Sequence, residues 1–262
     1  MTYRKVIACG NVIEIYEFEK EPGVKEINEH DDGYDALDFD KTDLTKTGKE
    51  WIEEEAKALR SKNRRKHTVR EARNLTRRLA LMNFGAGDSF ITLTYAENMR
   101  DLEKADDDFK KFVKRFKYQF SLDDFKYIAV REFQKRGAIH FHVLCNWNRR
   151  FESEEEIKEC ERYFGEKLWG HGFVDIKPID HVDNVGAYLI KYMTKNIAIE
   201  LFKGKKMYLC SKGLERPITF RGEEAERIME LYELKNKKEV FTNNYESEYF
   251  GTITYKEYNL KR

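Results

Sequence analysis

The apolar positions along the chain repeat with the period of a strand in some segments and of a helix in others. Residues 3–19 alternate enough for a strand or hairpin, with "CGN" as its turn. Four runs rich in β-branched and aromatic residues predict further strands, at residues 89–95, 125–133, 137–145 and 172–179. Gly137 lies in the short connection between the middle two runs, where a hairpin needs positive φ. The pattern therefore predicts a hairpin at this point.

Helical periodicity separates these runs. Thr68 and Glu71 have the spacing of a capping box, which predicts the start of a helix that Gly85 ends. Three more helices are expected after Asp101, after Ser153 and over residues 183–197. The order is strand, helix, strand, strand, helix, strand, helix. It predicts an α+β fold, a split β-α-β-β-α-β or ferredoxin-like unit with an antiparallel sheet and helices packed on it.

Three regions are expected from this organisation. Residues 1–86 form an N-terminal extension with a strand, an acidic segment and a basic helix. Residues 87–200 hold the split unit. Residues 201–262 form a C-terminal extension with a helix near residues 223–234 and two β-like runs near its end.

Composition narrows the class of protein. The 262 residues are 40% hydrophobic and 37% charged, which suits a folded chain with a very polar surface. No apolar run is long enough to span a bilayer, and the N-terminus does not resemble a signal peptide. The four cysteines are scattered without a CxxC pair, as expected for reduced thiols. We therefore expect a cytoplasmic protein without a membrane partner.

The net charge of +1 conceals a strong asymmetry. Residues 26–55 are rich in Asp and Glu, and the following segment is strongly basic. A basic block of this kind is a candidate phosphate-binding surface, and a solvated helix face explains it equally well. The candidate DNA-binding residues in it are Arg64, Arg65, Lys66, Arg70, Arg73, Arg77 and Arg78.

The segment "IHFHVLC" places two imidazoles in an apolar strand. Side chains alternate along a strand, so His140 and His142 point the same way, and a turn near Arg136 sets Glu132 across from His140. Two imidazoles and a carboxylate leave positions open on a divalent ion for water and phosphate. The alternatives are two core histidines, a closed zinc site completed by His171 or His181, and a non-haem iron site.

The segment "AYLIKYMTKN" supplies a second group of reactive side chains. At a hundred degrees per residue, one arc of the helix carries Tyr188, Lys191, Tyr192 and Lys195. A tyrosine can act as a covalent nucleophile, but ionising a phenol at pH 7 costs about 4 kcal/mol. Neighbouring ammonium groups lower that cost and can bind a phosphate. The alternative is a helix edge on which Tyr and Lys lie at the surface without a chemical role.

Together these motifs resemble those of the HUH endonucleases, in particular the rolling-circle replication initiators of plasmids and single-stranded DNA phages. "FITLTY" is similar to the first family motif, "HFH" with Glu132 to the second, and "YLIKY" to the third. The resemblance covers about residues 89–197. It implies Mg²⁺ or Mn²⁺ held by His140, His142 and Glu132. It also implies Tyr188 as nucleophile, Lys191 as the motif lysine and Tyr192 as the second tyrosine of a two-tyrosine subfamily.

The activity implied is nicking and joining of single-stranded DNA or an origin hairpin through a 5′-phosphotyrosine that leaves a free 3′-hydroxyl. No GxxxxGK[ST] loop occurs, so a host helicase would open the duplex and a host DNA polymerase would extend the 3′ end. Other HUH enzymes, a single-strand transposase or a mobilisation relaxase, would use the same residues. A non-enzymatic DNA-binding module with a structural metal is the third reading.

Overall fold

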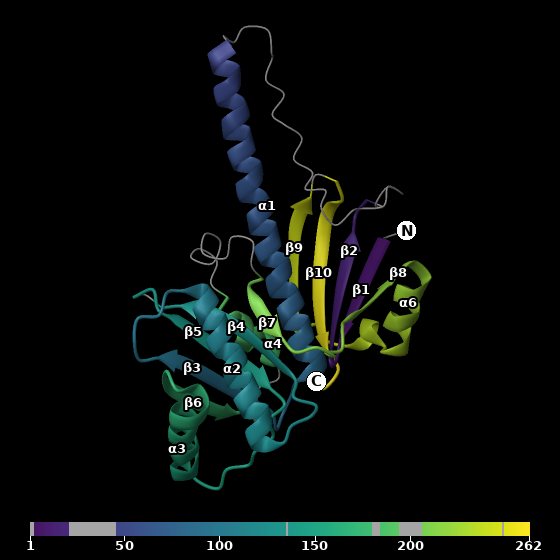
Figure 1. Ribbon diagram of the computed structural model, residues 1–262. Helices are drawn as coiled ribbons and strands as arrows, with labels where there is room; N and C mark the ends of the chain where they lie inside the picture. Colours follow the sequence, from purple (N-terminus) through teal and green to yellow (C-terminus); the bar gives the residue numbers. More distant parts are fainter. Residues whose placement is uncertain (1–2, 21–45, 135, 180–183, 194–205, 248) are drawn as a thin grey trace. The chain divides into compact units, whose positions relative to one another are not determined.

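The structure, a computed structural model, describes residues 3–20, 46–134, 136–179, 184–193, 206–247 and 249–262 (Figure 1). The chain divides into two compact units. One comprises residues 1–70 with 217–262, and the other comprises residues 71–216. No helix among the described residues is long and apolar enough to cross a membrane.

The unit of residues 71–216 contains the split β-α-β arrangement. Its strands are β3 (Ser89–Tyr95), β4 (Tyr127–Phe133), β5 (Ile139–Cys145), β6 (Gly172–Pro178) and β7 (Tyr208–Cys210). They lie in the order β6-β3-β5-β4-β7, and every neighbouring pair is antiparallel. Helix α2 (Leu102–Phe120) connects β3 to β4, and β5 lies between those two strands. The predicted α+β fold is therefore confirmed.

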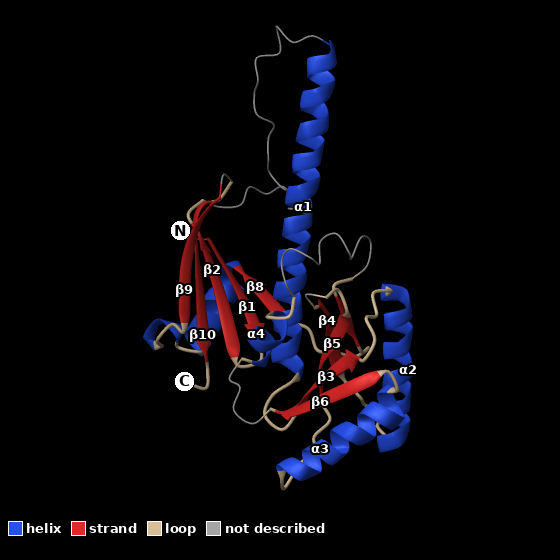
Figure 2. Ribbon diagram, turned by 90° about the vertical axis from the view of Figure 1, so that its left-hand side faces the viewer, coloured by secondary structure: helices blue, strands red, loops and turns tan. Residues whose placement is uncertain are grey.

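An aromatic core covers one face of this sheet. Phe109 on α2 stacks on Phe141 of β5, with ring centroids 4.8 Å apart. Phe116 of α2 meets Phe164, the first residue of the π-helical turn η1 (Phe164–Trp169) that follows α3 (Glu154–Tyr163). Figure 2 shows α2 and α3 on the same side of the sheet. Burial of these rings leaves the other face, which carries His140 and His142, for a different use.

Capping explains where the helices of this unit begin. The Asp101 carboxylate accepts hydrogen bonds from the first backbone N–H groups of α2. The Ser153 hydroxyl accepts one from Glu156 N–H at the start of α3. Gly137 has a φ of 87° in the β4–β5 connection, as the hairpin requires. These three expectations are confirmed.

The capping box predicted at Thr68 and Glu71 was wrong. Both residues lie inside one helix, α1 (Lys46–Asn83), which ends shortly before Gly85 as expected. No glycine or proline interrupts the sequence from Lys49 to Phe84, so nothing stops helical hydrogen bonding before Thr68. A capping box inside a continuous helix former does not start a new helix.

The other unit joins both ends of the chain in one sheet. Its strands are β1 (Tyr3–Cys9), β2 (Val12–Phe18), β8 (Ile218–Arg221), β9 (Phe241–Ser247) and β10 (Gly251–Asn259). They lie in the order β8-β1-β2-β10-β9, so β10 pairs with β2, as the purple and yellow strands of Figure 1 show. The predicted hairpin at residues 3–19 is confirmed.

A small core covers one face of this second sheet. Helix α6 (Gly222–Leu231) and the short helix η2 (Leu234–Asn236) contribute Ala225, Met229 and Leu234 to it. These side chains pack on Val6 and Ile15 of the first two strands. The segments expected as separate N- and C-terminal extensions therefore share one apolar core.

Candidate active site

The hairpin brings the predicted metal ligands to one face of the sheet. His140 pairs with Glu132 across to β4, as expected, and with Thr94 across to β3. His142 pairs with Val130 on β4 and with Thr92 on β3. Directly opposed residues share a face, so the two imidazoles, the carboxylate and the threonine hydroxyls gather there.

Two hydrogen bonds hold the His142 ring. Its Nε2 lies 2.7 Å from Glu132 Oε2, and its Nδ1 lies 3.3 Å from Thr92 Oγ1. A neutral imidazole with the proton on Nε2 donates to the carboxylate and accepts from the hydroxyl. The bond to His142 lowers the pKa of Glu132, because it stabilises the charged carboxylate.

His140 is held differently. Its side chain is 7% exposed, and its Nε2 is buried with no hydrogen-bond partner among the described residues. Burial, and then the neighbouring His142, lowers the pKa of His140 to about 4. The ring is therefore neutral at pH 7, and the Nε2 lacks the partner that a buried polar atom normally has.

The three side chains do not form a ready-made metal cage. Within the described ranges, no group of three or more His, Cys, Asp and Glu side chains is arranged to hold a metal ion. Glu132 and His142 instead bond to each other. His181, one candidate fourth zinc ligand, lies outside the described residues. The other, His171, lies 3.5 Å from Asp108.

The predicted tyrosine helix is short. Helix α4 (Val185–Ile190) begins at Asn184, whose side chain accepts a hydrogen bond from Ala187 N–H. The next backbone bonds run from Lys191, Tyr192 and Met193 to residues three positions earlier, the tighter pattern of a 3₁₀ turn. The α-helix expected to reach Ile197 thus ends at Ile190. Lys195 lies outside the described residues.

The two phenols meet above the histidine strand. Tyr192 donates a hydrogen bond to the Tyr188 oxygen, with the two oxygens 3.2 Å apart. The Tyr192 ring stacks on His142, with centroids 3.6 Å apart and planes inclined by 22°. Phe90 of β3 contacts both tyrosine rings and that of His142. The tyrosine motif and the histidine motif therefore form one site.

Charge around the phenols differs between them. Burial, and then the bond to Tyr188, raises the pKa of Tyr192, so that phenol stays neutral. Lys191 Nζ lies 5.2 Å from the centre of the Tyr188 ring. A cation at this distance favours negative charge on Tyr188. Of the two oxygens, that of Tyr188 has both a donor and a nearby ammonium to stabilise an anion.

Helix α1 supports the tyrosine segment from behind. The Arg73 guanidinium donates to the carbonyl of Met193, the residue after Tyr192. The backbone of Arg77 runs against Gly186 so closely that a Cβ there would overlap the Arg77 carbonyl. Two of the predicted DNA-binding arginines thus lie at the back of the site.

The other basic residues are placed less fully. Arg70 is exposed and Arg78 is half-buried on α1. The side chains of Arg64, Arg65 and Lys66 lie outside the described residues. DNA binding by this set stays a prediction.

Two residues of the site were not singled out from the sequence as functional. Phe90 contacts three rings of the site, and Thr92 fixes His142. Both belong to "FITLTY", but their role depends on β3 pairing with β5 rather than with a strand nearer in sequence. Alternation along that run was the only available signal.

The comparison with protein families bears on this site. Residues 88–197 match the family of replication-associated proteins of the ORF2 type. The matched range contains the histidine hairpin and the tyrosine helix, and it covers less than half of the chain. The match to the replication-associated family supports a replication initiator of the Rep type that acts on DNA. No curated protein and no solved structure was found to match.

Proposed function

We propose that this protein is a rolling-circle replication initiator that nicks and rejoins single-stranded DNA through a covalent 5′-phosphotyrosine. The observation that carries the proposal is the stacking of Tyr192 on His142, with the Tyr188 hydroxyl bonded to Tyr192. It joins a nucleophile to a group of phosphate-directed side chains inside the range that matches a replication-associated family.

Tyr188 is the proposed nucleophile. Its oxygen forms a bond to phosphorus as the bond between phosphorus and the 3′ oxygen breaks. The phenolic proton lost by Tyr188 is balanced by the proton that the leaving 3′ oxygen takes up. The Tyr192 hydroxyl and the Lys191 ammonium stabilise the Tyr188 oxygen while it carries charge, which offsets part of the about 4 kcal/mol that ionisation costs at pH 7.

The donor set suits Mg²⁺ or Mn²⁺. The unpartnered Nε2 of His140 is a lone pair in need of a cation or a donor, and Glu132 with His142 adds a carboxylate and a second imidazole. A bound ion would supply positive charge that offsets charge developing on the phosphate. Ligation by His142 requires its bond to Glu132 to be exchanged, and Thr92 would then keep the ring oriented.

Exchange of one phosphoester for another keeps the energy of the bond, so the strand can be rejoined without ATP. A polymerase can extend the released 3′-hydroxyl, and Tyr192 can cut the regenerated junction after one round. The second phenol lies within hydrogen-bonding distance of the first, which suits such alternation. Duplex opening falls to a host helicase.

A denaturing gel tests this proposal. The protein is incubated with a labelled origin oligonucleotide and Mn²⁺, and a covalent adduct is expected. The double variant Tyr188→Phe/Tyr192→Phe should form none, and His140→Ala should lose the metal dependence. An adduct that persists in the double variant would refute the assignment. Salt-sensitive DNA binding without any adduct would support a non-enzymatic binding module instead.

A further inference from the structure

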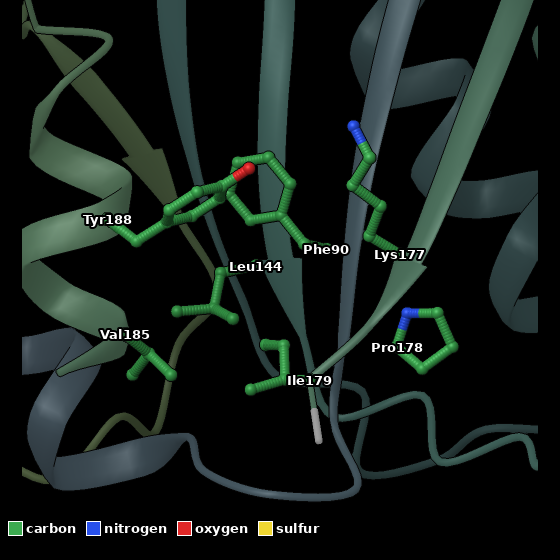
Figure 3. A pocket seen from close by; sticks show the side chains of 7 residues that line it. All are labelled: Phe90, Leu144, Lys177, Pro178, Ile179, Val185 and Tyr188. Carbon is green, nitrogen blue, oxygen red and sulfur yellow. The ribbon is translucent and has the colours of Figure 1, made fainter. Parts of the chain in front are cut away.

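A hollow lies directly beside Tyr188 (Figure 3). Its volume is about 180 Å³, below the roughly 300–1,000 Å³ of a pocket for a whole small-molecule ligand. Its walls are mostly apolar and come from β3, β5, β6 with the residue after it, and α4: Phe90, Leu144, Pro178, Ile179 and Val185. The size and lining suit one flat ring rather than a complete nucleotide.

Two polar groups border this hollow. In Figure 3 the Tyr188 hydroxyl and the Lys177 ammonium lie toward one end of it, and Val185, Ile179 and Pro178 lie toward the other. Lys177 pairs with Asp175 at 3.1 Å, and both side chains are at least half exposed. An exposed ion pair contributes little stability, so a phosphate can readily compete for the ammonium.

Strand β6 carries an exposed aromatic ring on the same face. Residues alternate along a strand, so Phe173, Asp175 and Lys177 share a face, and they pair with Thr94, Thr92 and Phe90 of β3. The Phe173 side chain is 70% exposed. It lies four residues from Lys177, a span of about 14 Å. Phosphates on one DNA strand are about 3.4 Å apart along the helix axis, so the two side chains would contact different nucleotides.

We infer that β6 and the adjoining hollow form a track for single-stranded DNA. One unstacked base enters the hollow beside Tyr188, Lys177 binds a phosphate next to that base, and a base further along stacks on Phe173. Apolar hollows and exposed rings recognise base faces without regard to sequence, and an ammonium recognises the backbone. The track rests on the proposed function, because it brings a phosphodiester to the proposed nucleophile.

The track can be tested by binding without cleavage. Fluorescence anisotropy in EDTA measures affinity for a fluorescein-labelled 20-nucleotide oligothymidylate and for an abasic strand of equal length. The wild-type protein should prefer the thymidylate strand. Phe173→Ala should weaken thymidylate binding by about 5- to 150-fold and leave abasic binding unchanged. Lys177→Ala should weaken both and reduce the slope of log affinity against log salt by about 0.7.

Matched controls lie on α2, which packs on the opposite face of the same sheet. Tyr118→Ala removes an aromatic ring that is 88% exposed, and Lys110→Ala breaks an exposed pair with Asp107 at 2.8 Å. Neither should change binding. Lys177→Arg should keep the salt slope. Val185→Phe, which fills the hollow, should reduce the preference for thymidylate. If that variant fails to fold, the two surface variants still decide the outcome.

The two proposals fail in different ways. Equal affinity of the wild-type protein for both strands, or an unchanged salt slope in Lys177→Ala, would overturn the track. A covalent adduct formed at the same time would leave the nuclease proposal standing. A base preference that depends on Phe173 and Lys177, with no adduct under any metal, would support the track and refute the nuclease.

Discussion

At the scale of single residues, the site is built from side chains that hold one another. Thr92 fixes His142, His142 holds Glu132, and Tyr192 lies between His142 and Tyr188. Each contact restricts the rotation of a reactive group before substrate arrives, which lowers the entropy cost of assembling the site. Small changes at supporting residues should therefore have measurable effects on chemistry.

Thr92→Val tests the support of His142. Loss of the hydroxyl frees the imidazole to rotate and should lower the single-turnover rate of adduct formation by about 10- to 100-fold. Thr92→Ser keeps the hydroxyl and should retain most of the rate. Thr94→Val, one alternation along the same strand, is the control. An equal rate in Thr92→Val and the wild-type protein would show that the contact has no role in chemistry.

His140 makes the stability of the metal-free protein depend on pH. Its pKa is about 4 in the folded chain against an ordinary value of 6.5, so the unfolded chain binds the proton first as pH falls. The contribution is complete above pH 6.5 and is lost between pH 6.5 and 4, by up to about 3 kcal/mol. The lowered pKa of Glu132 acts in the same direction at lower pH.

Urea denaturation in EDTA at several pH values measures this dependence. His140→Asn removes the titrating group, so its free energy of unfolding should change less between pH 6.5 and 4.5 than that of the wild-type protein. Identical pH profiles for the two proteins would contradict the assignment of the acid sensitivity to His140.

At the scale of elements, the position of α4 depends on close packing against α1. Gly186→Ala places a methyl group against the Arg77 carbonyl and should lower the free energy of unfolding by about 1–3 kcal/mol. The displaced helix should also slow adduct formation. Gly85→Ala, where a Cβ meets nothing within 4 Å, is the matched control. Thermal unfolding and the gel assay measure the two effects, and full activity in Gly186→Ala would contradict this role.

The sequence predicted the elements of the split unit better than their ends. Alternation and capping located β3 to β6 and the starts of α2 and α3, because these signals are local. The start of α1 was missed, since Thr68 and Glu71 match a cap whose neighbours favour a continuing helix. The early end of α4 was also missed, because the change to i−3 hydrogen bonds leaves no mark in the residue pattern.

The pairing of Glu132 with His140 was predictable because a short hairpin sets its own register. The contacts of Phe90 and Thr92 with the site were not, since they depend on which strands become neighbours after the chain has crossed over through α2. The joining of β2 with β10 lay further out of reach for the same reason, with nearly the whole chain between them.

At the scale of the whole molecule, the two units have separate cores, and one of them depends on the last strand. Deleting residues 251–262 removes β10 from between β2 and β9. Amide hydrogen exchange should then speed up in β1 and β2 while β3 and β5 stay protected. Deleting only Lys261 and Arg262, which are exposed, is the control. Equal loss of protection in both sheets would show that the units unfold together.

The pairing of Val12 with Asn259 also sets the order in which a growing chain can fold. All five strands of the sheet that carries the histidines lie between residues 89 and 210, so they are complete well before synthesis ends. The N-terminal hairpin leaves the ribosome first but waits for its central partner through about 12 to 50 s of translation. During that interval one edge of β2 is unpaired, so the earliest part of the protein to be made is the last to gain its place.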